Sequence, residues 1–126
     1  MIYKLLIIGF GGFLGSVSRF LLAKIIQEEA NSSFPWGTLI VNILGSFIIG
    51  IIFALSVKNN LLSPMWRNFL AIGFCGAFTT FSTFSLDNYQ LLANQQFVFS
   101  LLYTLLSVIL GFIFLYSGII LVRVLT

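Results

Sequence analysis

Four long apolar segments leave almost no polar sequence between them, and this pattern is the strongest constraint on the fold. A helix that spans a bilayer needs about 20 predominantly apolar residues, and soluble domains carry roughly 25% charged residues. Only 7% of this 126-residue chain is charged. We therefore predict an all-α integral membrane protein with one transmembrane domain over residues 1–126. Its four expected helices cover residues 3–26, 36–57, 64–93 and 97–125.

The connections between the segments are short and polar, and they cover residues 27–34, 58–63 and 94–96. Short connections make consecutive helices antiparallel neighbours, so both termini are expected on one side of the membrane. Pro35 with Trp36, and Pro64 with Trp66, stand where the second and third segments begin. Proline is typical of a first helical turn, and tryptophan is typical of the membrane interface.

The positive charges favour one orientation only weakly. Lys4, Lys58, Arg67 and Arg123 belong to the side that carries the termini, and Lys24 belongs to the other side. Because an excess of Lys and Arg on the cytoplasmic side sets the orientation of a membrane protein, so small a bias is compatible with insertion in both orientations. Insertion in one orientation, with both termini in the cytoplasm, is the alternative.

The residue types that are missing exclude several classes of protein. The chain has no histidine and a single cysteine, Cys75, so it lacks the commonest general base, an internal disulfide and a cysteine-based metal site. Its net charge is +3, without a cluster of basic residues, which argues against binding to nucleic acid. We therefore expect neither an enzyme nor a nucleic-acid-binding protein.

Small and polar residues recur on one face of the first, second and fourth segments. Small residues allow close helix packing, and hydroxyls bond across helix interfaces, which accounts for most of the glycines. This explanation fits less well for Asn42 and for the hydroxyls of the fourth segment, which share about a third of the helix circumference at roughly 100° per residue. The faces comprise Gly11, Gly15 and Arg19, then Thr38, Asn42, Gly45 and Ser46, and finally Ser100, Tyr103, Thr104, Ser107, Gly111 and Gly118.

The third segment has an unusual middle, with the sequence GFCGAFTTFSTFS over residues 73–85. Gly73 and Gly76 weaken a helix, and Thr79 lies near the centre of the segment. A backbone interrupted at that depth exposes carbonyls that lipid cannot pair, so they must face protein, water or an ion. Many transporters build ion sites from such discontinuous helices. On the pattern alone, a continuous helix whose hydroxyls bond to their own preceding turns is an equally supported alternative.

Charged residues inside the segments are few. Arg19 lies about 22 Å beyond Lys4 along an ideal helix, and we expect it to reach the far headgroup region by snorkelling. No carboxylate lies deep in the first or second segment. Proton-coupled transporters need a protonatable group in their pathway, so passive conduction is favoured over pumping.

The stretch GFCGAFTTFSTFS resembles the signature of the CrcB/Fluc family of bacterial fluoride channels. The sequences GGFLGSVSRF around Arg19 and PWGTLIVNILGSF around Asn42, with the stripe at Tyr103 and Ser107, support the resemblance. It implies passive export of fluoride through the bacterial inner membrane by an antiparallel homodimer, in which one chain inserts in both orientations. It also implies two pores per dimer and a structural sodium ion, not transported, at the dimer centre.

The resemblance further implies roles for individual residues. The backbone carbonyls of Gly76 and Thr79 would hold the sodium ion at a break in the third helix. Arg19 and Asn42 would belong to the vestibule, and Phe81 and Phe84 would line the pore. The implied polar track comprises Thr38, Ser82, Thr83, Tyr103 and Ser107. Gly111 stands where some members of the family continue the track with a hydroxyl, and Asp87 stands where some have a longer carboxylate.

Two other functions compete with this one. A small dual-topology drug or cation exporter would need an acidic residue in the first segment, and residues 3–26 contain none. A structural subunit of a larger membrane complex would show no flux when reconstituted alone. Transport of fluoride by the purified protein therefore separates all three functions.

Overall fold

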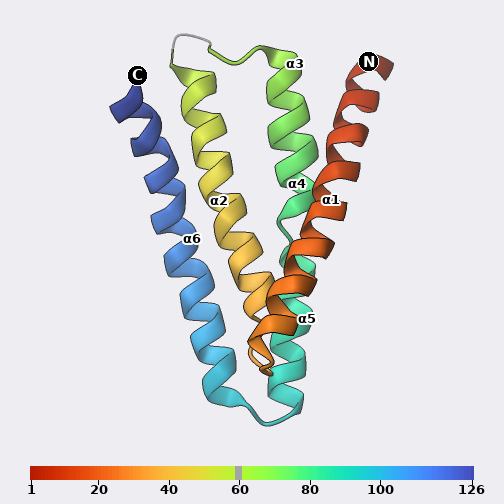
Figure 1. Ribbon diagram of the computed structural model, residues 1–126, viewed down its shortest axis with the longest axis vertical. Helices are drawn as coiled ribbons and strands as arrows, with labels where there is room; N and C mark the ends of the chain where they lie inside the picture. Colours follow the sequence, from red (N-terminus) through yellow and green to blue (C-terminus); the bar gives the residue numbers. More distant parts are fainter. Residues whose placement is uncertain (59–60) are drawn as a thin grey trace.

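The computed structural model describes residues 1–58 and 61–126, and it is all-helical in this part of the chain (Figure 1). Four helices are long and apolar enough to cross a membrane, if the interrupted stretch from Pro64 to Ala93 is taken as one span. Both termini lie at the same end of the bundle, as predicted (Figure 1). The helical elements are α1 (Ile2–Ala30), α2 (Trp36–Val57), α3 (Pro64–Arg67), η1 (Asn68–Cys75), α4 (Gly76–Phe78), α5 (Phe81–Ala93) and α6 (Phe97–Leu125).

The helix bounds agree with the expected ranges except at the end of the first helix. Helices α2 and α6 have the expected bounds, whereas α1 continues to Ala30 through polar residues that were assigned to a connection. Gln, Glu and Ala are strong helix formers, so polarity alone did not end this helix. It ends at Asn31, which adopts the left-handed conformation with φ 46°. The expected connection 58–63 includes residues 59 and 60, which lie outside the described part.

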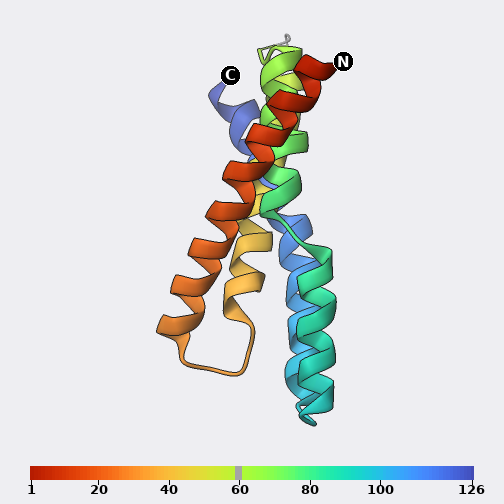
Figure 2. The same cartoon turned by 90° about the vertical axis from the view of Figure 1, so that its right-hand side faces the viewer.

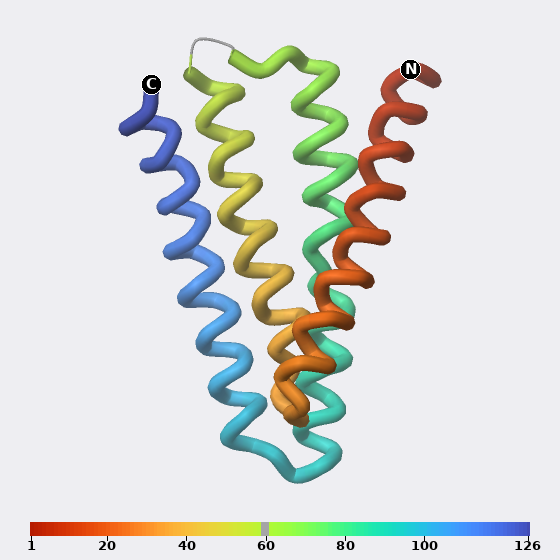
Figure 3. The backbone as a smooth tube through the Cα atoms, in the orientation of Figure 1, coloured from red at the N-terminus to blue at the C-terminus, as the bar shows by residue number. Residues whose placement is uncertain are grey.

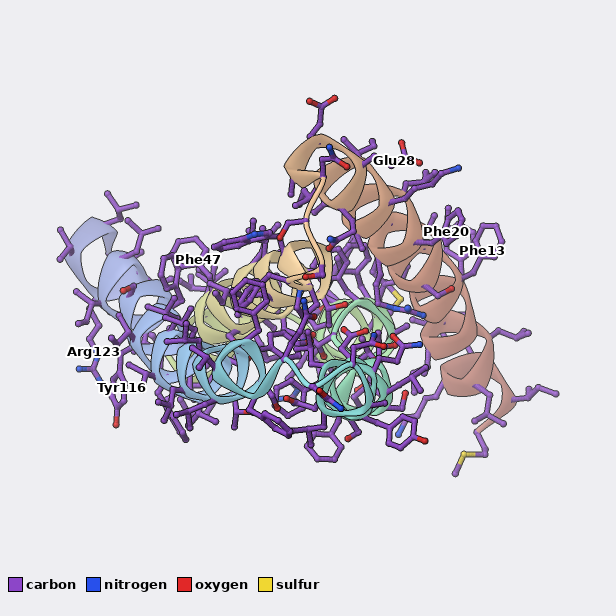
Figure 4. All side chains as sticks on the ribbon, turned by 90° about the horizontal axis from the view of Figure 1, so that it is seen from below. Phe13, Phe20, Glu28, Phe47, Tyr116 and Arg123 are labelled. Carbon is purple, nitrogen blue, oxygen red and sulfur yellow. The ribbon has the colours of Figure 1, made fainter. Side chains whose placement is uncertain are left out.

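Aromatic side chains cover the outer surface of the bundle. Phe13 and Phe20 project away from α1, and Tyr116 projects away from α6 (Figure 4). Phe13 and Phe20 are 62% and 60% exposed, which would be unfavourable in water but is expected for side chains that face acyl chains. The outer surface therefore supports the prediction of a membrane protein.

Helix α1 packs closely against η1 because both present glycine at the contact. A Cβ atom added at Gly15 would overlap the Phe74 carbonyl, and one added at Gly73 would lie 2.7 Å from the Ile8 oxygen. Gly9, in contrast, has open space around it. Gly11 and Gly15 thus allow close helix packing, as predicted for this face.

Helices α2 and α6 form the second close pair, and they lie side by side in Figures 1 and 3. Added Cβ atoms would overlap the Leu115 carbonyl at Gly50 and the Phe47 carbonyl at Gly118. Figure 2 shows the lower ends of α1 and α2 on one side and α5 with the lower part of α6 on the other, and the ring of Phe34 in the α1–α2 turn contacts Phe99 of α6. The molecule therefore contains two glycine-packed pairs, which are joined by the third span and by direct contact between α1 and α2 at Gly37.

The third span is broken at Thr79 and Thr80, so the continuous alternative is wrong. Both residues are extended, with φ −89° and ψ 153° at Thr79 and φ −150° and ψ 119° at Thr80. The helix restarts at Phe81, where the Thr80 hydroxyl accepts a hydrogen bond from the Thr83 N–H at 3.1 Å, as an N-cap threonine does. The interruption is visible between α4 and α5 (Figure 3).

The glycines that suggested the break do not form it. Gly73 lies within the π-helix η1, and Gly76 is in right-handed helical geometry at φ −59°. The preceding π-helix was not anticipated, because no residue type marks an i→i+5 hydrogen-bond pattern. The break falls instead at the paired threonines, where the Thr80 hydroxyl accepts from the Thr83 N–H that the interrupted helix leaves free.

Candidate ion-conduction site

Asn42 of α2 clamps the broken backbone from the side. Its Oδ1 accepts a hydrogen bond from the Thr80 N–H at 2.9 Å, and its Nδ2 donates to the Thr80 carbonyl at 3.2 Å. One carboxamide thus satisfies both backbone groups of a residue that has left the helix. The Nδ2 group carries two hydrogens, so one hydrogen remains for another acceptor.

The break leaves two backbone carbonyls without their usual donors. The Thr80 N–H, which would pair with the Gly76 carbonyl in a continuous helix, bonds Asn42 instead. The Thr83 N–H, the corresponding donor for Thr79, bonds the Thr80 hydroxyl. Within residues 1–58 and 61–126, no hydrogen bond to the Thr79 carbonyl is found. Gly76 and Thr79, whose carbonyls are the predicted sodium ligands, both line the main cavity.

Arg19 does not snorkel to the far headgroup region, and that prediction is wrong. Its Nε donates to the Ala77 carbonyl at 3.0 Å, one residue before the last residue of α4. A charged donor gains more from an unpaired carbonyl within the bundle than from a long reach to the interface. Arg19 therefore places a positive charge beside the break.

An open cavity of about 550 Å³ lies against the break. It brings together residues from the second, third and fourth spans that are far apart in the sequence. Its lining includes Asn42, Gly45 and Ser46 from α2, then Ala71, Cys75, Gly76, Thr79, Thr80, Phe81 and Phe84, and Ser107 and Val108 from α6. Six of the predicted site residues thus converge: Asn42, Gly76, Thr79, Phe81, Phe84 and Ser107.

Ser107 has a special place in this cavity. Its Oγ is buried and has no hydrogen-bond partner in the described structure. A buried hydroxyl without a partner costs roughly 1–3 kcal/mol, so such groups usually signal a missing ligand, ion or water. Next to it, the Ser46 hydroxyl lies 3.7 Å from where a Cβ at Gly111 would be. Ser46 of α2 therefore places a hydroxyl beside Gly111, the position of α6 at which the track has no hydroxyl of its own.

A second polar cluster lies one to two turns along α5 and α6 from this cavity. Tyr103 is fully buried, and its hydroxyl donates to Asp87 Oδ2 at 3.0 Å. The Thr38 hydroxyl also lies near the Tyr103 hydroxyl. Tyr103 and Thr38 therefore do not line the main cavity but continue from it toward the end of the bundle where α5 meets α6.

Asn88 is a residue of this cluster that the sequence patterns did not single out. Its Oδ1 accepts hydrogen bonds from Ser100 Oγ at 2.7 Å and from Thr104 Oγ1 at 3.3 Å. These two hydroxyls donate to Asn88, so their protons are not free for an anion. The sequence signal that could have identified Asn88 is an amide side chain within an apolar segment, which is the signal that identified Asn42.

Two aromatic rings connect the cavity to the second cluster. Phe81 and Phe84 have centroids 5.8 Å apart, and Phe84 lies 5.0 Å from the Tyr103 ring. Phe81 is 79% exposed, whereas Phe84 is partly buried against the aromatic core. The three rings form a continuous path from the broken backbone to Tyr103.

Ser82 and Thr83 are the predicted track residues that lie off this path. Their hydroxyls lie 3.2 Å from the Thr80 hydroxyl. Neither residue lines the main cavity. In this structure they belong to the hydrogen-bonded cap that restarts α5.

The part of the chain that the structure describes holds no group of three or more His, Cys, Asp or Glu residues able to bind a metal. Any cation at the break would therefore depend on neutral carbonyl oxygens. Such ligands suit hard cations, and divalent ions usually recruit carboxylates as well.

Comparison with known proteins agrees with this geometry. A family model described as CrcB-like protein, Camphor Resistance (CrcB), matches residues 6–119, which includes all the residues of the cavity. The chain belongs to the CrcB-like family. The resemblance drawn from the third-segment sequence is thereby confirmed.

Several bacterial members of the CrcB-like family are similar to the chain over nearly its whole length. A protein named fluoride-specific ion channel FluC from Leptospira interrogans is 46% identical over 92% of this chain and 91% of its own length. Proteins with the same name from Chlorobium chlorochromatii and Hahella chejuensis are 47% and 44% identical, and each comparison covers 94% of this chain with 92% and 94% of the relative.

Proposed function

We propose that this chain forms a passive, fluoride-selective channel in the bacterial inner membrane and exports fluoride from the cytoplasm. The observation that carries the proposal is the cavity at the broken third span, where the Ser107 hydroxyl is buried and has no partner among the described residues. The FluC names of the bacterial relatives support the same conclusion. A channel of this kind is not an enzyme.

Fluoride binds water strongly, so a selective pore must replace that water with hydrogen-bond donors. Asn42 and Ser107 both line the cavity. Each can donate a hydrogen bond, Asn42 from the remaining Nδ2 hydrogen and Ser107 from its hydroxyl. The positive edges of Phe81 and Phe84 would add weaker contacts to an anion. Among the residues named as lining the cavity there is no Lys or Arg, so the ion would bind weakly enough to leave again.

The flux of halides through the reconstituted protein tests this proposal. Liposomes that contain the purified protein, loaded with potassium fluoride, are expected to release fluoride when valinomycin balances the charge. Liposomes loaded with potassium chloride are expected to retain it, because chloride is too large for close contact with all the donors at once. Equal release of both anions would contradict selectivity, and release of neither would favour a structural subunit.

We further propose that two copies pack as an antiparallel homodimer with two pores. In the single chain the cavity is open, and Phe81 is mostly exposed. A two-fold axis in the membrane plane would bring two copies of the break together, since the break lies near the middle of its span. The second copy would close each cavity into a pore.

Labelling of the C-terminus tests insertion in both orientations. A cysteine placed after Thr126, in a Cys75→Ala background, is expected to react with a membrane-impermeant maleimide from both sides of the cell membrane. The weak positive-charge bias is the reason. Labelling from the cytoplasmic side alone would show a single orientation and contradict the antiparallel dimer.

The dimer would bind one structural sodium ion at its centre. The Gly76 and Thr79 carbonyls of each copy lack their usual donors, so two copies would offer four oxygen ligands around the axis. Neutral oxygens suit a monovalent ion. When bound, the sodium would add positive charge near the break, where Arg19 bonds the Ala77 carbonyl.

A further inference from the structure

The Gln27 side chain makes three hydrogen bonds to the backbone in and just after the turn between α1 and α2. Its Nε2 donates to the carbonyls of Ser32 at 2.9 Å and Phe34 at 3.0 Å. Its Oε1 accepts from the Gly37 N–H at 3.0 Å. The amide thus uses both donor hydrogens and its acceptor. Pro35 stands at the N-cap of α2 and has no side-chain hydrogen-bond acceptor, so Gln27 Oε1 pairs the Gly37 N–H at this helix start instead.

The position of Gly37 shows why this turn is tight. A Cβ at Gly37 would overlap the Ala23 carbonyl, so α1 and α2 are in backbone contact directly beside Gln27. Phe34 is held from both sides, since its N–H donates to Ser32 Oγ at 3.1 Å and its carbonyl accepts from Gln27 and from the Trp36 N–H. The turn therefore has one geometry as long as Gln27 remains bonded.

The residue that this turn presents to the interior is Phe34. It is only 4% exposed, and its ring meets the ring of Tyr103 edge-on at 5.8 Å and 81°. Phe99 packs against Phe34 in the same way, at 5.4 Å and 87°. On its other side Tyr103 lies 5.0 Å from Phe84. Tyr103 is thus enclosed between Phe34 from the turn and Phe84 from the cavity wall.

We propose that Gln27 is a positioning residue for the conduction path: it fixes the turn 31–35, and through Phe34 it sets the orientation of Tyr103. This inference rests on the proposed fluoride conduction. Among the described residues, Gln27 does not line the main cavity, and its hydrogen bonds go to Ser32, Phe34 and Gly37, so it would act through the packing of Phe34. The Tyr103 hydroxyl then keeps its place at Asp87, in line with the aromatic path.

A double-mutant cycle of fluoride release tests the inference. Gln27→Ala removes three neutral hydrogen bonds and is expected to lower the release rate about fivefold. In a Tyr103→Phe background the same change should lower the rate by less than about twofold, because residues that act through one another are not additive. Gln90→Ala is the matched control, since the Gln90 side chain is exposed and makes no hydrogen bond in the described structure.

A spectroscopic measurement distinguishes positioning from a general loss of structure. Trp36 lies 4.7 Å from the Phe34 ring, so in a Trp66→Phe background its emission should shift to the red in Gln27→Ala and not in Gln90→Ala. If Gln27→Ala does not purify as a single species, Gln27→Glu replaces it, since that carboxylate keeps the acceptor for Gly37 but loses both donors.

The outcomes separate this inference from the proposed function. Wild-type liposomes that release no fluoride would overturn both. Normal wild-type release, with Gln27→Ala and Gln27→Glu equally active, would overturn the inference alone. A fivefold loss that persists unchanged in the Tyr103→Phe background would also overturn it, because Gln27 would then act independently of Tyr103.

Discussion

Replacement of Asn42 with alanine is expected to lower fluoride release by about a hundredfold and to destabilise the protein as well. The change would leave the Thr80 N–H and carbonyl unpaired at the break, at a cost of about 1–3 kcal/mol for each buried group. It would also remove the free Nδ2 hydrogen from the cavity wall. The rate is measured with a fluoride electrode, and the stability by thermal unfolding in detergent.

Asn94→Ala provides the control for this experiment. Asn94 is exposed at the end of α5, and its side chain makes no hydrogen bond in the described structure. We expect the Asn94 variant to keep the release rate within about twofold and the wild-type unfolding temperature, since exposed substitutions usually change stability by less than about 0.5 kcal/mol. An Asn42→Ala protein with wild-type flux would show that the clamp is not needed for conduction.

Replacement of Ser107 with alanine is expected to change flux and stability in opposite directions. Loss of a donor to a charged group costs about 1.5–3 kcal/mol, which corresponds to a roughly tenfold to hundredfold slower release of fluoride. The same change removes a buried hydroxyl that has no partner, so the unfolding free energy should rise by about 1 kcal/mol. A substitution that only damaged the structure would lower both the rate of fluoride release and the unfolding free energy.

The matched control for Ser107 is Ser117→Ala on the same helix. The Ser117 hydroxyl is exposed and bonds the Ile113 carbonyl at 2.8 Å, four residues before it. Its removal should leave fluoride release unchanged within about twofold and should alter stability by only a few tenths of a kcal/mol. If Ser107→Ala destabilised the protein and left the flux unchanged, Ser107 would be a packing residue and the conduction path would lie elsewhere.

The hydroxyls of α6 near the cavity differ in whether they already have a hydrogen-bond acceptor within the protein. Ser100 and Thr104 donate to Asn88, and Tyr103 donates to Asp87. Ser107 donates to no described residue. Of these four fourth-span hydroxyls, Ser107 is the one that can donate to an anion without first giving up a partner in the described structure, whereas fluoride at Tyr103 would compete with a carboxylate.

The prediction of Arg19 at the far headgroup region was wrong for a specific reason. The prediction used the length of an ideal helix and the reach of the Arg19 side chain. Neither quantity includes the helices that pack against α1. A carbonyl at the break, Ala77, lies within 3.0 Å of its Nε. The position of that carbonyl depends on how the third span packs against α1, which no pattern within residues 3–26 contains.

The break itself was only half predictable. The density of threonine and serine marked the middle of the third span correctly, but Gly73 and Gly76 were the wrong cause. Gly73 is needed for contact with α1, and the chain leaves the helix at Thr79 and Thr80. Asn42, 38 residues away, pairs the N–H and the carbonyl of Thr80. This pairing stabilises the break in the bilayer, where lipid offers these groups no partner.

The sequence alone determined that the chain crosses the membrane four times, that its termini lie on one side, and which residue types are available as donors. These properties follow from hydropathy and connection length, which act locally along the chain. Only the tertiary structure decided which polar groups are paired and which are left for an ion. Asn42 bonds Thr80 and Arg19 bonds Ala77, because a polar group within the bilayer must find its partner in the protein, and packing decides which partner is near. The same packing leaves Ser107 without a partner among the described residues.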